Sequence, residues 1–109
     1  MLAMQHALND VFIADALKEY IVAVAQATRE HADVELPVSP RGSIALMRAA
    51  MGAAMLVGRE YVLPDDVQDM AVPVLAHRLG LRPAARAKGG SGETVLGEIV
   101  KAIPVPAAQ

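Results

Sequence analysis

The spacing of apolar residues along this 109-residue chain predicts four main helices joined by short connections. In the first main helix, one face collects residues at helical spacing: Leu17, Tyr20, Ile21, Val24 and Thr28. Asp15 is a candidate N-cap for this helix, which we expect to end near Glu30. A short helix over residues 3–9 and a connector over residues 11–14 are expected to precede it.

The start of the second helix is predicted by Ser39 and Pro40, because serine is a good N-cap and proline suits the first helical position. The residues that follow are apolar on nearly every side up to Leu56 or Val57. Such a helix is central in its domain or covered by a partner. Residues 31–38 are expected to form a loop before it, because a proline among them blocks helical continuation.

The third helix is expected to begin with Pro-Asp-Asp at residues 64–66, since acidic residues in a first turn are favoured by the helix dipole. Its predicted buried stripe contains four residues: Val67, Met70, Ala71 and Val74. Pro73 is expected to kink or end this helix, because proline lacks the backbone donor that an interior position needs.

The fourth helix is expected to begin after Ser91, as its N-cap, and to end near Ala102. Its predicted buried residues are Val95, Leu96, Ile99 and Ile103. Residues 77–92 are expected to be mostly loop. Their glycine and basic residues predict mobility over residues 82–91.

The composition favours an all-α fold in a single domain over residues 1–109. Hydrophobic residues make up 54% and aromatic residues only 3%, so the core must be aliphatic and rich in good helix formers. The formal net charge is −2 and no basic block exists, so no nucleic-acid partner is expected. Because cysteine, a signal peptide and a membrane-spanning apolar run are all missing, we expect a soluble, cytoplasmic protein without membrane insertion.

Residues that could carry catalysis are few, and we expect no catalytic residue and no metal site in this chain. The histidines are scattered, without metal-ligand spacing: His6, His31 and His77. Asp65 and Asp66 are adjacent, so on a helix they point apart and are better explained as acids at a helix start. The Lys-Gly-Gly-Ser-Gly stretch at residues 88–92 fails the phosphate-loop pattern, because its lysine precedes the glycines.

Arg41 is different, because it falls in the first turn of the second helix, where a cation opposes the helix dipole. A helix start favours anions, and an arginine there adds a planar fork that fits phosphate oxygens. The alternative is an ion pair with Glu35 or Asp33 in the preceding loop. Physical reasoning from the residues leaves these two roles equally open.

Four short motifs, taken in order, resemble the C-terminal lid domain of the MoxR family of AAA+ ATPases. They are Ala-Thr-Arg at residues 27–29, Ser-Pro-Arg at residues 39–41, Pro-Asp-Asp-Val at residues 64–67 and His-Arg-Leu at residues 77–79. The combination is specific, although each motif alone is weak, and the likeness covers nearly the whole chain. It implies a small lid bundle of four to five helices. The ATP-binding core of the family is absent, so we expect an excised domain with Met1 added.

The resemblance also implies roles for three residues. The arginine of the family's Ser-Pro-Arg motif is the sensor 2 residue, which makes Arg41 the contact to the phosphates of ATP. Tyr20 and Ile44 are weaker candidates for the adenine side, with a plain core role as the alternative. ATP with Mg²⁺ is the implied cofactor of a parent ATP hydrolase, whereas the isolated chain is expected to bind no cofactor and hydrolyse nothing.

The implied partners are an N-terminal ATPase core, neighbouring subunits of a hexamer, and von Willebrand A-type domain proteins that the parent would remodel or mature. Two positions depart from the family. Pro37-Val38 replaces Gly-Ala, and Leu63 replaces a threonine, which should remove about 1 kcal/mol of capping. One alternative is a free-standing helical interaction module that uses the methionines of residues 47–55. The other is the lid of a magnesium-chelatase-like ATPase.

Overall fold

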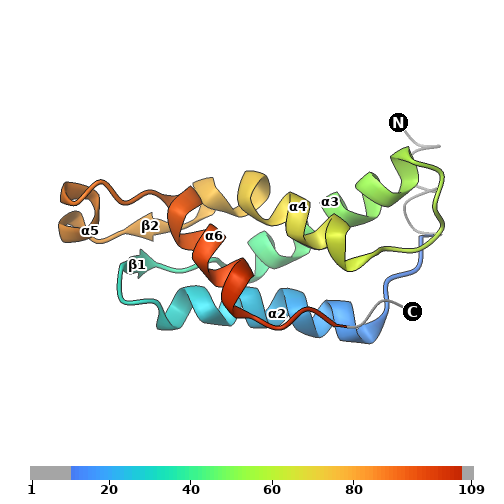
Figure 1. Ribbon diagram of the computed structural model, residues 1–109, viewed down its shortest axis with the longest axis horizontal. Coiled ribbons are helices and arrows are strands. Elements are labelled where there is room, and N and C mark those ends of the chain that lie inside the picture. The colour runs from blue at the N-terminus through green and yellow to red at the C-terminus, as the bar shows by residue number, and fades with distance from the viewer. Residues whose placement is uncertain (1–10, 107–109) are drawn as a thin grey trace.

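The computed structural model describes residues 11–106, and its long helices form a flattened bundle of 45 × 31 × 20 Å (Figure 1). The expected helix over residues 3–9, and His6 within it, lie outside the described residues. The long helices are α2 (Asp15–Glu30), α3 (Pro40–Leu56), α4 (Pro64–Leu75) and α6 (Gly92–Ala102). They agree with the four predicted helices, and the predicted all-α lid bundle is confirmed.

Serine caps begin two of these helices as predicted. The Ser39 side chain accepts a hydrogen bond from the backbone N–H of Gly42 at the start of α3. Ser91 accepts one from the N–H of Thr94 at the start of α6. At the end of α3, Gly58 has a φ of 81°, the left-handed conformation that glycine adopts without strain.

The core lies between α2, α3, α4 and α6. The predicted face of α2 is fully confirmed, since all five of its residues are buried. Helix α3 buries every fourth residue, and three of the four are small: Gly42, Leu46, Ala50 and Ala54. This row allows α3 to pack closely along α4. The methionines of α3 at residues 47, 51 and 55 are half-buried against the same core.

The segment after α4 contains more regular structure than the sequence indicated. A single 3₁₀ turn, η1 (Ala76–Arg78), leads to strand β2 (Gly80–Leu81) and then to the short helix α5 (Pro83–Ala87). Strand β2 pairs antiparallel with β1 (Val34–Leu36), joining Val34 to Leu81. The expectation of mostly loop over residues 31–38 and 77–92 is therefore wrong. The mobility of residues 82–91 remains a prediction.

Pro73 does not end α4, which continues two residues further to Leu75. An interior proline removes one backbone donor, and here it does so on an exposed side of the helix. The helix then tightens into η1. The buried stripe of α4 includes Val67, Ala71 and Leu75, whereas Met70 and Val74 are only half-buried.

The predicted cap of α2 is also wrong. Ala14 occupies the N-cap position, and Asp15 is the first helical residue, 3.9 Å from the amino group of Lys18. The connector before it is held by backbone hydrogen bonds to a later loop. The N–H of Phe12 donates to Glu60 at 2.8 Å, and its carbonyl accepts from Val62 at 2.9 Å.

Candidate functional site at the start of helix α3

Arg41 lies in the first turn of α3 with its side chain exposed. Pro40 precedes it at the first helical position, where no backbone N–H is needed. Within residues 11–106, the Arg41 guanidinium forms neither a hydrogen bond nor an ion pair, so the alternative pairing with Glu35 or Asp33 is not made. Its five donors are thus available to an outside anion.

A buried threonine fixes the approach to this helix start. Thr28 is fully buried, and its hydroxyl donates to the carbonyl of Ala25 at 2.6 Å. The same hydroxyl accepts the N–H of Val38 at 3.1 Å. The last turn of α2 is thereby tied to the residue just before the Ser39 cap.

Gly42 makes a second close contact at this point. A Cβ atom added to Gly42 would lie 2.6 Å from a methyl carbon of Val38, which is closer than real contacts allow. Only glycine therefore permits the first turn of α3 to sit this near to the incoming chain. The positions of Arg41 and Thr28 relative to one another follow from these two local constraints.

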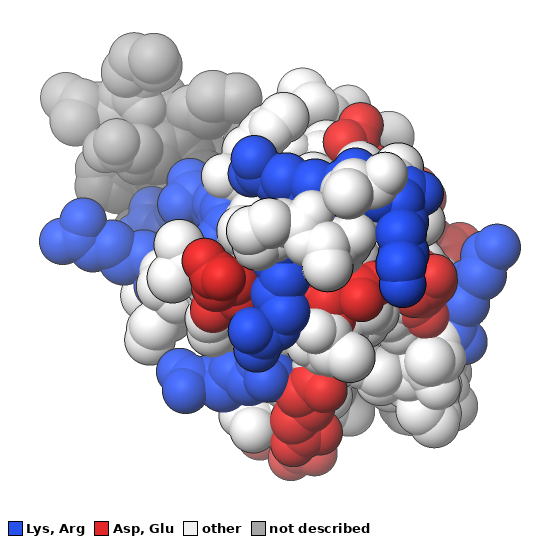
Figure 2. Space-filling model, turned by 90° about the vertical axis from the view of Figure 1, so that its left-hand side faces the viewer, with Lys and Arg blue, Asp and Glu red and all other residues white. Residues whose placement is uncertain are grey.

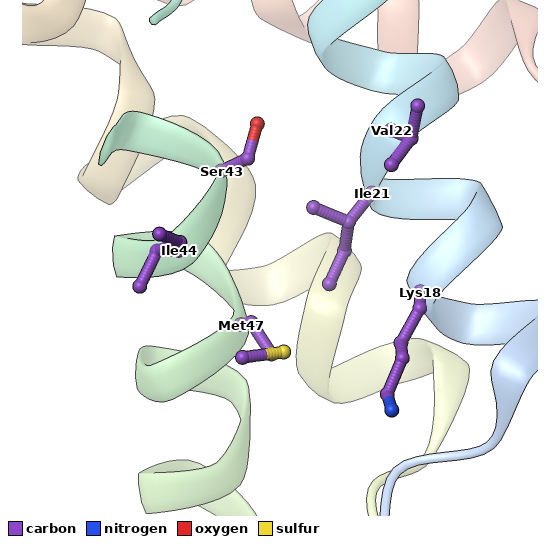
Figure 3. Close-up of a pocket in the computed structure, with 6 residues that line it drawn as sticks. All are labelled: Lys18, Ile21, Val22, Ser43, Ile44 and Met47. Atoms are coloured by element: carbon purple, nitrogen blue, oxygen red, sulfur yellow. The ribbon is translucent and has the colours of Figure 1, made fainter. Parts of the chain in front are cut away.

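A groove between α2 and α3, here named the α2–α3 groove, is lined by Pro40, Ser43 and Ile44 from the start of α3, whereas Arg41 itself does not line it. Its first hollow, of about 150 Å³, is lined by Lys18, Ile21, Val22, Ser43, Ile44 and Met47. Figure 3 shows Ile21 and Met47 pointing into the gap from opposite helices. Ile44 is 52% exposed, which places this candidate for the adenine side at the surface of the groove.

Tyr20 does not line this groove. It is only 3% exposed, so the structure supports its alternative role as a core residue. Burial raises the pKa of its phenol, and the nearby Gln68 side chain offsets part of that rise. The Tyr20 hydroxyl has no partner with hydrogen-bonding geometry among the described residues.

A second arginine, Arg59, was not singled out by the sequence. Its guanidinium binds both carboxylate oxygens of Asp66, at 2.7 and 2.9 Å, and also donates to the carbonyl of Tyr61. The Asp66 carboxylate additionally accepts the N–H of Leu63 at 2.8 Å. This bond is the half of a capping box that the residue at position 66 supplies, whereas leucine has no side-chain acceptor to supply the other half. The loss of capping at Leu63 remains a prediction.

Asp66 is 7% exposed, and its partners lower its pKa, chiefly through the hydrogen bond from Arg59. Asp65 is exposed instead, so the two adjacent carboxylates have different surroundings. The only signal in the sequence for the Arg59–Asp66 contact was an arginine seven positions before an acid in the first turn of a predicted helix.

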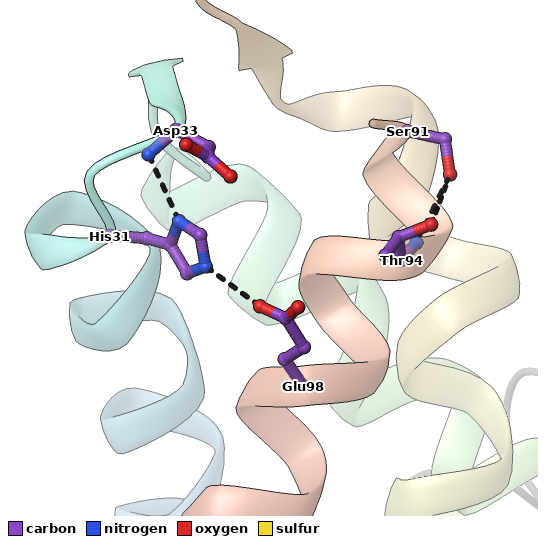
Figure 4. A network of polar contacts seen from close by, with 5 residues as sticks. All are labelled: His31, Asp33, Ser91, Thr94 and Glu98. Atoms are coloured by element: carbon purple, nitrogen blue, oxygen red, sulfur yellow. Dashed lines mark hydrogen bonds and ion pairs between the residues drawn. The ribbon is translucent and has the colours of Figure 1, made fainter. Parts of the chain in front are cut away.

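The described histidines have separate surroundings. Figure 4 shows His31 between the backbone of Asp33 and the side chain of Glu98. Its Nδ1 accepts the Asp33 N–H at 3.1 Å, and its Nε2 lies 3.1 Å from a Glu98 oxygen, which joins the end of α2 to α6. His77 is exposed. No group of three potential metal ligands occurs among residues 11–106.

No helix in the described part of the chain is long and apolar enough to cross a membrane. The exposed end that carries β1, β2 and α5 shows basic and acidic side chains interspersed (Figure 2).

The family model of the AAA lid domain matches residues 26–99. The chain belongs to the AAA lid domain family, and the resemblance that the four motifs carry is confirmed. Residues 26–99 include Arg41, the α3 part of the groove and the Arg59–Asp66 pair.

Within that family, the chain is similar to proteins of the MoxR type. It is 33% identical to the chaperone MoxR1 of Mycobacterium tuberculosis, over 97% of this chain and 30% of that protein. It is 38% identical to the protein MoxR of Paracoccus denitrificans, over 85% of this chain and 32% of that protein. It is 48% identical to the protein YeaC of Bacillus subtilis, over 94% of this chain and 32% of that protein.

A crystal structure of a protein assigned as an ATPase, from Cytophaga hutchinsonii, matches the fold with a TM-score of 0.87 and 29% identity. The match covers 94% of this chain and 34% of that one. The chain spans about a third of the length of the curated relatives it matches.

Proposed function

We propose that this chain is the nucleotide-facing lid of a MoxR-type AAA+ ATPase and that Arg41 is its sensor 2 residue, in contact with the phosphates of ATP. One observation carries the proposal. In a chain of the AAA lid family, Arg41 has no partner among residues 11–106, and it follows Pro40, which lines the α2–α3 groove, at the start of a helix. Its two neighbours in the motif, a serine cap and a proline, fix that helix start.

The chemistry assigned to Arg41 is neutralisation of phosphate charge. A guanidinium can bind two phosphate oxygens at once, and the free donors of a helix start add to the attraction. Phosphoryl transfer is accelerated mainly by such positioning and electrostatic stabilisation. The phosphate-binding loop and the ligands for Mg²⁺ belong to an ATPase core, so this chain alone is proposed to hydrolyse nothing.

The α2–α3 groove is proposed to bind the apolar part of the nucleotide. Ile44 lies at the surface of this groove and is proposed to face the adenine side of the nucleotide. Ser43 and Ile44, which line the groove, lie within one turn of Arg41 on α3. A nucleotide held between core and lid would then couple its phosphates and its base to one rigid element, α3.

Partners follow from the same proposal. The α2–α3 groove would close on an ATPase core, and neighbouring subunits of a ring would surround it. One relative is named a chaperone, which supports remodelling of client proteins as the output of the cycle. Proteins with a von Willebrand A-type domain are proposed as those clients, and the cytoplasm as the place of action.

The test is ATP turnover by the native gene product, with Arg41→Ala compared with Arg48→Ala. Arg48 is a matched control, because it is also exposed on α3 and makes no ion pair among the described residues, but it lies about two turns beyond the helix start that carries Arg41. Arg41→Ala is expected to lower the turnover about tenfold or more, and Arg48→Ala to leave it unchanged. Equal turnover in the two variants would refute the role of Arg41.

A further inference from the structure

The α2–α3 groove has a second hollow, of about 300 Å³, that extends toward the start of α3. It shares Val22, Ser43 and Ile44 with the first hollow, so the two are continuous. Pro40 and Val38 line its far side. The second hollow therefore joins the apolar part of the groove to the helix start that carries Arg41.

Arg29 lines this second hollow, from the last turn of α2. Its side chain is exposed and makes no ion pair or hydrogen bond with any residue that the structure describes. A cation near a helix C-terminus is favoured by the dipole, which accounts for an arginine on this turn. The dipole does not account for an unpaired guanidinium at the wall of a hollow.

The charge of the groove is of one sign. Lys18 lies in the first hollow and Arg29 in the second, and no acidic residue of the described segment 11–106 lines either. The remaining walls are apolar or neutral. This lining is complementary to a ligand with an anionic part and an apolar part, and a nucleoside triphosphate has both.

The backbone segments that carry Arg29 and Arg41 are tied together by one hydrogen bond. Thr28 adjoins Arg29 in sequence, and its buried hydroxyl holds the N–H of Val38, three residues before Arg41. The guanidinium groups thus extend from two backbones that are tied together at this point. A polyphosphate in the second hollow would meet Arg29 in its wall, with Arg41 next to Pro40 at its edge.

We propose that Arg29 is a second phosphate-binding residue of the nucleotide cleft and acts together with Arg41. This inference rests on the proposed lid function and deepens it. Arg29 would approach the phosphates from α2 and Arg41 from α3. Each would hold the lid closed on the anion, so both helices would respond to the loss of a phosphate group.

The experiment measures equilibrium binding of ATP and of adenosine to the native gene product and its variants. Arg29→Ala is expected to weaken ATP binding about threefold to tenfold and to leave adenosine binding unchanged, because adenosine carries no phosphate. Arg29→Lys should recover part of the loss, since it restores the charge without the planar fork. Arg48→Ala is the control and should bind both ligands normally.

Three outcomes separate this inference from the proposed function. If Arg41→Ala weakens ATP binding while Arg29→Ala matches Arg48→Ala, the role of Arg29 is refuted and the lid function stands. If Arg29→Ala weakens ATP and adenosine equally, Arg29 docks the lid on the core, and the phosphate contact is refuted. If the unmodified gene product binds no ATP, the proposed function fails, and this inference fails with it.

Discussion

The starts of α3 and α4 are built alike but have opposite electrostatics. Each begins with a proline at the first helical position and has an arginine close by. At α4, the guanidinium of Arg59 forms two hydrogen bonds with the carboxylate of Asp66, and two acids occupy the first turn. At α3, no acid occupies the first turn, and Arg41 has no partner among the described residues. The first arrangement is complete within the fold, whereas we propose that the second binds an anion from outside.

The comparison teaches that an arginine in a motif is not informative by itself. Its partners decide whether it stabilises the domain or serves a ligand. Arg59 joins the loop that follows α3 to the first turn of α4, so we assign it a structural role. Arg41 and Arg29 make no bond of this kind within the described fold, and we propose a ligand-binding role for both.

The largest expected effect on stability is that of Asp66→Ala. This variant removes the acceptor for the Leu63 N–H and leaves Arg59 without its partner at a half-buried position. We expect the free energy of unfolding to fall by about 2 kcal/mol. Urea denaturation checks this value. A change as small as that of Asp65→Ala, an exposed neighbour, would contradict the assigned structural role.

The same pair predicts a dependence of stability on pH. The pKa of Asp66 is lowered in the folded protein from its ordinary value of 3.8, chiefly by the hydrogen bond from Arg59. The contribution of Asp66 to the free energy of unfolding is therefore fully present above pH 3.8 and is lost as the pH falls through the lower pKa of the folded state. Wild type should lose more stability than Asp66→Asn between pH 6 and acid conditions below the ordinary value. Parallel pH profiles for the two proteins would show that the pair does not stabilise the fold.

Gly42→Ala is expected to have a somewhat smaller effect, of about 1–2 kcal/mol, because the new methyl group would collide with Val38. The matched control is Gly97→Ala in α6, where a Cβ meets nothing within 4 Å. That control should be stabilising by about 0.5–1 kcal/mol, since alanine is the better helix former. Thermal unfolding of both variants measures the difference. Stabilisation by both substitutions would mean that the start of α3 is less tightly packed than the structure shows.

The smallest expected effect on stability is that of Arg41→Ala. Removing a cation from the first turn of a helix should leave the fold unchanged or stabilise it, by at most about 0.5 kcal/mol. The same urea denaturation that tests Asp66→Ala measures it. A clear loss of stability would mean that Arg41 has a structural role after all, and the contrast between the two helix starts would disappear.

Features that depend on neighbouring residues in the sequence were predicted well. Ser39 with Pro40, and Ser91, marked two helix starts, because a cap and its helix lie within one turn. The buried face of α2 was predicted completely, since its spacing is regular over four turns. The candidate Arg41 could be found, but only its surroundings in the structure could exclude a pair with Glu35 or Asp33.

Features that depend on distant residues were missed. Strands β1 and β2 have three and two residues, which is too short for an alternating pattern, and they are defined only by pairing with each other. The Arg59–Asp66 contact needs a particular loop path between two helices. Arg29 belongs to the Ala-Thr-Arg motif, but its role could not be predicted, because its place in a hollow depends on how α2 packs against α3.

The most direct test of the central claim is amide hydrogen exchange of the native gene product with and without ATP. The account predicts that ATP slows exchange over residues 22–29 of α2 and 39–44 of α3, the two segments that line the second hollow. Helix α5 follows β2 and contributes no residue to the groove. It should exchange at the same rate in both states and serves as the internal reference. Unchanged exchange over residues 22–29 and 39–44 in the ATP-bound protein would contradict the claim that this groove faces the nucleotide.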